Sequence, residues 1–177
     1  MAIDPAFRQR LEFDLVNGPV TASEFAICEF IIAPILQEMW RTYHTSLTLW
    51  SHVYFGREEP LVGLPDYFFS RRSALGGWVM DQPYLLFAEA KGDNFDMGWG
   101  QCLAAMLAAQ KENAHPQQPI HGIVSSGRIW YFGRLTAQTL AQDLRPFTIA
   151  RLDDLFGALK FVFDATSQLA KQQESKP

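Results

Sequence analysis

The feature that most constrains the fold is a continuous apolar run, Tyr84-Leu-Leu-Phe-Ala88, which leads straight into Glu89-Ala90-Lys91. A short, uninterrupted apolar run is typical of a strand that is buried on both faces of a sheet. Side chains alternate between faces along a strand, so Glu89 and Lys91 share one side, with their Cα atoms about 6.6 Å apart, while Ala90 faces the opposite layer. The sequence therefore predicts one acid and one base together at the end of a central strand.

Hydrophobic periodicity predicts the elements around this strand. Apolar residues at helical spacing predict a first helix over about 22–43, which begins at the capping-box pattern Thr21-Ala-Ser-Glu24 and is kinked or divided at Pro34. The other expected elements are strands at 45–55, 64–70, 120–124 and 129–132, helices at 101–113, 136–143 and 152–170, a turn at 57–63, a long flap-like connection at 70–83 and a frayed end at 171–177. This order predicts an α/β fold, in which a mixed sheet is flanked by helices.

Composition favours one domain over 1–177, with its core at about 20–170, because 48% of the 177 residues are hydrophobic and 19% are charged. Cys28 and Cys102 lie far apart and form no CxxC motif, so we expect neither a disulfide nor a thiolate zinc site, and a reducing, cytoplasmic location. The first residues lack the apolar core of a signal peptide, and the apolar stretch 25–39 is too short and too polar to cross a membrane.

The formal net charge of −4 excludes a global positive field of the kind that coats nucleic acid non-specifically. A nuclease is not excluded, because a metal site gathers carboxylates and needs only a local basic rim. The candidate phosphate-contacting residues near such a site are Arg71, Arg72, Arg128 and Arg134.

Asp66 adds a second carboxylate to the pair on the central strand. It lies 23 residues before Glu89, in the preceding predicted strand, and antiparallel pairing of the two strands could bring the carboxylates together. Hard oxygen ligands of this kind hold Mg²⁺, which activates water and neutralises charge on phosphoryl oxygens. The nearby ammonium of Lys91 would stabilise transition-state charge. The group thus suits phosphodiester hydrolysis.

These residues resemble a known superfamily. The pattern Pro65-Asp66, then Glu89-Ala90-Lys91 after an apolar strand, then Gln101 early in the next helix, resembles the PD-(D/E)xK phosphodiesterases. The hairpin sequence over 122–135 also resembles the N-terminal nuclease domains of type I restriction motor subunits. The resemblance implies a restriction-endonuclease-like mixed β-sheet flanked by α-helices.

The resemblance also implies roles for particular residues. Asp66 and Glu89 would bind Mg²⁺ or Mn²⁺ together with the Ala90 carbonyl, Lys91 would be catalytic, and Gln101 would border the site. Relatives often add a glutamate from the first helix, and Glu38 and Glu29 are both candidates.

The implied function is a metal-dependent nuclease that hydrolyses phosphodiester bonds of DNA, with RNA as the second choice of substrate. The alternative is a catalytically inactive subunit that keeps the fold for contacts with nucleic acid or protein. Either function is compatible with a homodimer, in which the apolar first helix forms the interface, or with a larger complex.

Overall fold

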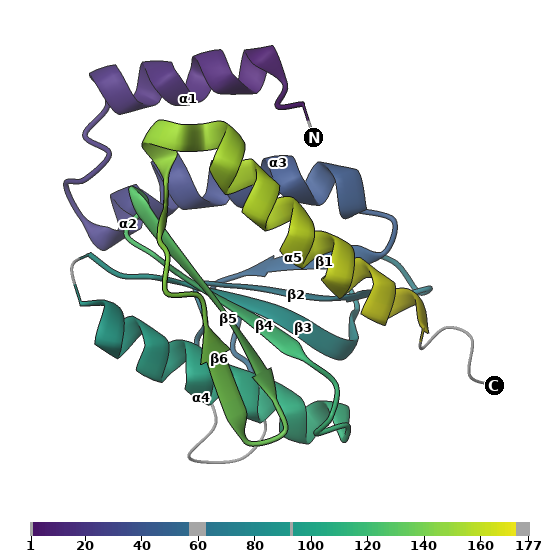
Figure 1. Cartoon of the computed structure of the whole chain (residues 1–177). Helices are drawn as coiled ribbons and strands as arrows, with labels where there is room; N and C mark the ends of the chain where they lie inside the picture. The colour runs from purple at the N-terminus through teal and green to yellow at the C-terminus, as the bar shows by residue number, and fades with distance from the viewer. Residues whose placement is uncertain (1, 57–62, 93, 173–177) are drawn as a thin grey trace.

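The apolar run forms the central part of strand β3 (Met80–Ala90), which is buried from Pro83 to Ala90. The computed structural model describes residues 2–56, 63–92 and 94–172. Strand β3 lies inside a mixed sheet with the order β1-β2-β3-β4-β5-β6, and a short β7 pairs with β5 (Figure 1). The other strands are β1 (Leu47–Ser51), β2 (Tyr67–Arg72), β4 (Ile120–Ser125), β5 (Ile129–Thr136), β6 (Thr139–Gln142) and β7 (Phe147–Thr148).

Helix α4 (Phe95–Asn113) connects β3 to β4, which are the parallel neighbours in the sheet. Parallel strands need such a crossover, because a tight turn can join only antiparallel ones. The helix covers one face of the sheet, where Cys102 and Met106 pack in a hydrophobic cluster with Phe68, Phe87 and Val124. The carboxyl end of β3 and the first turn of α4 therefore meet at one edge of the sheet.

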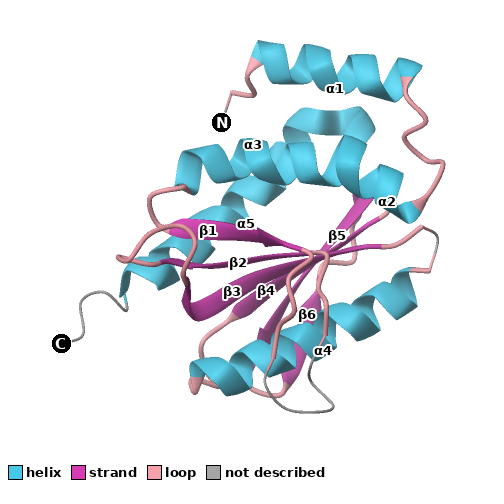
Figure 2. Ribbon diagram, turned by 180° about the vertical axis from the view of Figure 1, so that it is seen from behind, coloured by secondary structure: helices cyan, strands magenta, loops and turns pink. Residues whose placement is uncertain are grey.

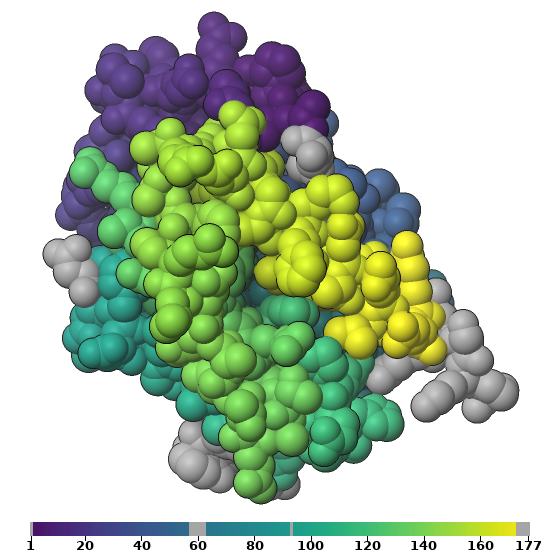
Figure 3. Space-filling view, viewed as in Figure 1, coloured from purple at the N-terminus to yellow at the C-terminus, as the bar shows by residue number. Residues whose placement is uncertain are grey.

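The opposite face is covered by the composite helix over 24–43, a short 3₁₀ turn (Ile149–Arg151) and α5 (Leu152–Gln172). Helix α1 (Pro5–Asn17) packs on the outside of these helices, as Figure 2 shows from behind. Figure 3 shows α1 in purple directly against the yellow-green α5, where Phe7 packs on Phe156 and Arg8 pairs with Asp153 at 2.7 Å. The sheet thus separates two hydrophobic clusters, one under each helical layer.

The first predicted helix consists of α2 (Glu24–Ile27), a π-helical turn (Cys28–Ile32) and α3 (Ala33–Tyr43). The expected interruption near Pro34 is confirmed: its ring removes a backbone donor and crowds the preceding turn, which widens there. The predicted capping box, in which Thr21 would be the cap, does not form. The cap is Ser23, which accepts a hydrogen bond from the Ala26 amide at 3.0 Å, so Glu24 is the first helical residue and its side chain is free for another contact.

Other boundaries differ from the sequence-based expectations. Residues 136–143 form no helix: β6 pairs back onto β5 through a two-residue turn in which Ala137 has a φ of 51°. The flap expected at 70–83 is shorter, because β2 continues to Arg72 and pairs with β3 from Met80. Helix α1 was not predicted, and α4 begins six residues before the expected start at Gln101.

The predicted fold class is confirmed, because the structure is an α/β arrangement with a mixed sheet between helical layers, as in restriction-endonuclease-like folds. The expected turn at 57–63 lies outside the described residues, apart from Gly63, and so does the expected frayed end beyond Gln172. Within the described ranges, every helix is too short or too polar to cross a membrane.

Candidate functional site

Antiparallel pairing of β2 with β3 brings the two predicted carboxylates together. Tyr67 lies opposite Ala88, so Asp66, one residue before β2, lies opposite Glu89. Asp66 Oδ2 accepts a hydrogen bond from the Ala90 amide at 2.8 Å, and the Glu89 carboxyl group is within hydrogen-bonding reach of Asp66. The predicted pairing is therefore present in the structure, at the carboxyl end of β3, where the strand is buried.

Glu89 lies in an environment that disfavours its charge. Its side chain faces α4 and the residue is only 5% exposed. Burial first, and then the neighbouring Asp66, raise the pKa of Glu89 from 4.5 to about 8, although Lys91 opposes the shift. Two carboxyl groups therefore share a site with too little positive charge for both to ionise freely. A divalent cation between them would supply that charge, so this donor set fits Mg²⁺ or Mn²⁺.

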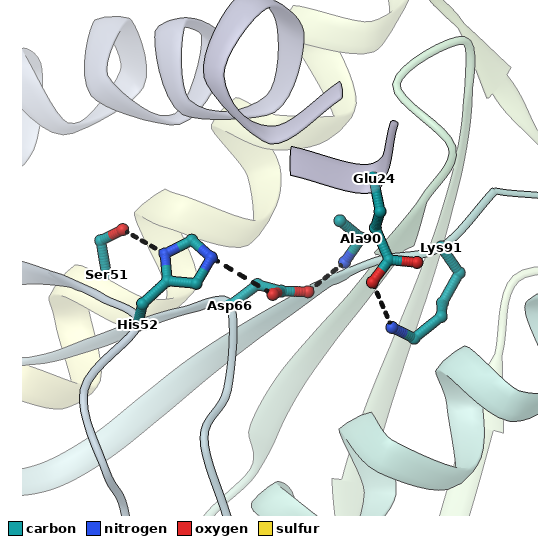
Figure 4. Close-up of polar contacts among 6 residues, drawn as sticks. All are labelled: Glu24, Ser51, His52, Asp66, Ala90 and Lys91. Atoms are coloured by element: carbon teal, nitrogen blue, oxygen red, sulfur yellow. Dashed lines mark hydrogen bonds and ion pairs between the residues drawn. The ribbon is translucent and has the colours of Figure 1, made fainter. Parts of the chain in front are cut away.

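Lys91 lies just beyond β3, where its amide donates to the Ser125 carbonyl at 2.9 Å. Its Nζ donates to Glu24 Oε1 at 2.8 Å, as Figure 4 shows, and its side chain is 13% exposed. Burial lowers the pKa of Lys91, but Glu24, Asp66 and Glu89 together outweigh this and raise it. The ammonium is therefore held in its charged form beside the carboxylates.

Gly98, in the first turn of α4, makes room for this lysine. A Cβ atom at Gly98 would lie 2.9 Å from Lys91 Cγ and 2.5 Å from Val124 Cγ1, which is closer than side-chain atoms can pack. Gly98 thus has a packing function, because it lets α4 approach the end of β3.

His52 is a neighbour of Asp66 that sequence reasoning did not identify. Its Nε2 lies 3.4 Å from Asp66 Oδ1, and its Nδ1 is hydrogen-bonded to Ser51 Oγ at 2.9 Å (Figure 4). Its amide also donates to the Asp66 carbonyl. The residue adopts a left-handed backbone with a φ of 51°. Cys28 approaches the same place from the π-helical turn, and burial followed by Asp66 raises the pKa of its thiol to about 11.

Of the two candidate glutamates, Glu29 stays a candidate for the site, because it lies close enough to Tyr67, the residue after Asp66, to add to the rise that burial causes in the pKa of that tyrosine. Glu38 pairs with Arg41 at 3.3 Å on α3, far along the helix from the sheet edge. Glu29 is exposed on the π-helical turn. Glu24, which starts α2, makes the direct contact with Lys91. Gln101 is exposed on α4, about one turn beyond Gly98, so it lies on the helix that borders the carboxylates.

The candidate arginines are divided between the two ends of the sheet. Arg71 and Arg72 lie at the far end of β2, roughly 16 to 20 Å along the strand from Asp66. Arg71 forms an ion pair with Asp81 at 2.9 Å. The expectation that these two arginines border the carboxylates is therefore wrong. Arg128 is exposed in the turn after β4, at the same edge as Ala90, because Ala90 pairs with Ser125.

Comparison with known proteins supports the fold. No family model matches the chain, and no curated protein matches it in sequence. Among solved structures, the chain is similar to one in the cryo-EM structure of a DrdV–DNA complex, with a TM-score of 0.52 and 19% sequence identity over 89% of this chain. The chain spans 13% of the length of that protein. At this identity the similarity shows a shared fold.

Proposed function

We propose that this chain is a nuclease domain of the PD-(D/E)xK type, which hydrolyses DNA with Mg²⁺ or Mn²⁺. The observation that carries the proposal is the pairing of Asp66 with the buried Glu89 at the end of β3, with Lys91 as the next side chain on that face. The similarity in fold to a protein from a DrdV–DNA complex supports DNA over RNA as the substrate.

In this proposal the metal is held by carboxylate oxygens of Asp66 and Glu89 and by the Ala90 carbonyl. When bound, the ion would activate a water molecule and neutralise charge on the phosphoryl oxygens. Since the pKa of Glu89 is about 8, metal binding near neutral pH would displace its proton, which makes the affinity rise with pH. Lys91 keeps its charge and would stabilise the developing negative charge of the substrate.

Glu24 would act on Lys91 and not on the metal. It holds Nζ at 2.8 Å and is itself 47% exposed, so it can release the lysine when a phosphate group arrives. Gln101 would contact the substrate from α4. Glu24 is therefore a positioning residue in this proposal, and Lys91 is the catalytic one.

Substrate binding would need positive charge from outside this chain. The net charge is −4, and of the arginines proposed to contact phosphate only Arg128 lies at the edge of the sheet where Ala90 ends. We propose that a second copy or another subunit completes the DNA-binding surface. The same observation supports the alternative function, a non-catalytic subunit that keeps the fold for binding.

The experiment is cleavage of linear, supercoiled and single-stranded DNA in Mg²⁺ or Mn²⁺, with Asp66→Asn, Glu89→Gln and Lys91→Ala compared against wild type. Asp153→Asn and Lys160→Ala are matched controls, because both residues lie on α5 and form surface ion pairs, Asp153 with Arg8 and Lys160 with Asp164. The proposal expects metal-dependent cutting that is lost in the three site variants and kept in the controls. DNA binding by folded wild type without cutting in either metal would favour the non-catalytic subunit.

A further inference from the structure

A second group of metal-ligand side chains lies on the other side of Asp66. Cys28 Sγ, a ring nitrogen of His52 and a carboxylate oxygen of Asp66 are all within 4.8 Å of one another. The three residues come from different elements: the start of the π-helical turn, the residue after β1 and the residue before β2. We propose that they form a site for Zn²⁺, distinct from the proposed Mg²⁺ site and joined to it through Asp66.

The separations suit a tetrahedral ion after a small adjustment. Zinc–ligand bonds of about 2.0 to 2.3 Å place neighbouring ligand atoms roughly 3.3 to 3.8 Å apart. His52 Nε2 and Asp66 Oδ1, at 3.4 Å, already have this separation, and the other pairs, which lie within 4.8 Å, would have to move closer by at most about 1 to 1.5 Å. Three protein ligands leave the fourth position for water or for an oxygen of another molecule, as in open zinc sites.

His52 is already held in the orientation that the site needs. Ser51 Oγ is bonded to Nδ1, which leaves Nε2 directed at Asp66 Oδ1 (Figure 4). Metal-bound histidines are oriented in this way by a partner at the other ring nitrogen. The left-handed backbone, with a φ of 51°, is uncommon for a residue other than glycine, and such conformations are frequent at functional sites.

The donor set selects the metal. A thiolate and an imidazole favour Zn²⁺ and related transition metals, whereas Mg²⁺ takes oxygen ligands. Asp66 is the one residue common to both sites, and its two oxygens face different neighbours: Oδ2 accepts from the Ala90 amide and Oδ1 faces His52. Asp66 would then share its negative charge between two cations, so Zn²⁺ at Oδ1 would weaken Mg²⁺ binding and inhibit cleavage. This consequence alone rests on the proposed function.

Titration of the metal-free, reduced chain with Co²⁺ tests the site without measuring cleavage, because a cobalt–thiolate bond gives charge-transfer absorption in the near ultraviolet. We expect this absorption to saturate at one equivalent and to disappear when Zn²⁺ is added. Cys28→Ser should abolish it, and His52→Asn, which tolerates the left-handed backbone, should weaken cobalt binding at least about tenfold.

Two controls separate this site from its surroundings. Cys102→Ser changes the other cysteine, which is buried under α4, and Glu89→Gln changes the proposed Mg²⁺ site; both should keep the cobalt–thiolate absorption. Absorption absent from folded wild type, or unchanged in both Cys28→Ser and His52→Asn, would overturn the zinc site. If Glu89→Gln loses cleavage but keeps the absorption, the zinc site forms independently of the proposed Mg²⁺ site.

Discussion

Replacing Glu89 by glutamine should remove a large pH dependence from the stability of the metal-free protein. In the folded chain the pKa of Glu89 is about 8, compared with 4.5 for an ordinary glutamate. The folded state therefore holds the proton more tightly than the unfolded state. The contribution of Glu89 to the free energy of unfolding is fully present below pH 4.5 and is lost as the pH rises towards 8.

The size of the effect follows from the same values. Each tenfold change in a proton-binding constant is worth about 1.4 kcal/mol, so the rise from 4.5 to about 8 corresponds to at most about 5 kcal/mol of unfolding free energy. Glutamine keeps the shape and a donor for Asp66 but carries no titrating proton. The free energy of unfolding of Glu89→Gln, relative to that of wild type, should therefore increase steadily as the pH rises across this range.

Urea unfolding of wild type and Glu89→Gln in EDTA, at a series of pH values between 4.5 and 8, measures this difference. Asp153→Asn is the control, because it also replaces a carboxylate by an amide, but on a side chain that is 78% exposed and pairs with Arg8. Curves for wild type and Glu89→Gln that run parallel across the range would refute the buried, proton-holding state of Glu89.

Three further predictions concern Gly98 and Glu24 beside the site, and His121, which is buried at the other end of β4. Gly98→Ala should lower the free energy of unfolding in urea by about 1 to 3 kcal/mol and reduce cleavage about a hundredfold, because its methyl group would lie 2.9 Å from Lys91 Cγ. Gly100→Ala is the control, because a methyl group there would enter open space and should have neither effect. Equal effects of the two substitutions would argue against the close approach of α4 to Lys91. Burial lowers the pKa of His121 from 6.5 to about 4, so the free energy of unfolding should fall by at most about 3 kcal/mol as the pH falls through this range. In His121→Gln this decrease should be smaller, as measured by acid unfolding. Glu24→Gln should change stability by less than about 1 kcal/mol, because the Glu24 side chain is 47% exposed, and it should leave Mn²⁺ affinity in calorimetry unchanged. A large loss of affinity would make Glu24 a metal ligand.

The centre of the fold could be predicted because its signals are local. The apolar run of β3 and the change to charged residues at Glu89 specify a buried strand with a polar end, and alternation separates Glu89 from Ala90. The pairing of Asp66 with Glu89 needed only the assumption that consecutive strands are antiparallel neighbours, which the register of β2 and β3 confirms. Helix α5 was predicted for the same reason, since its apolar stripe repeats at helical period.

The rest of the site depends on tertiary packing that no local pattern encodes. His52 reaches Asp66 only through the left-handed turn after β1, and nothing in its neighbourhood distinguishes it from the other histidines in the sequence. Glu24 was taken for part of a capping box. Its contact with Lys91 joins residues 67 positions apart, so no local pattern indicates it. Arg71 was misplaced because β2 begins three residues later than expected and extends away from the site. Strand β6 was taken for a helix because its partner β5 determines its conformation.

A crystal structure of the protein with Mn²⁺, with an anomalous difference map, would reveal directly whether a divalent metal binds at the end of β3. We predict a peak bonded to the carboxylates of Asp66 and Glu89 and to the Ala90 carbonyl, at about 2.1 Å from each. At saturating Mn²⁺, a map without density between these residues, or with density only beside Cys28 and His52, would contradict this prediction.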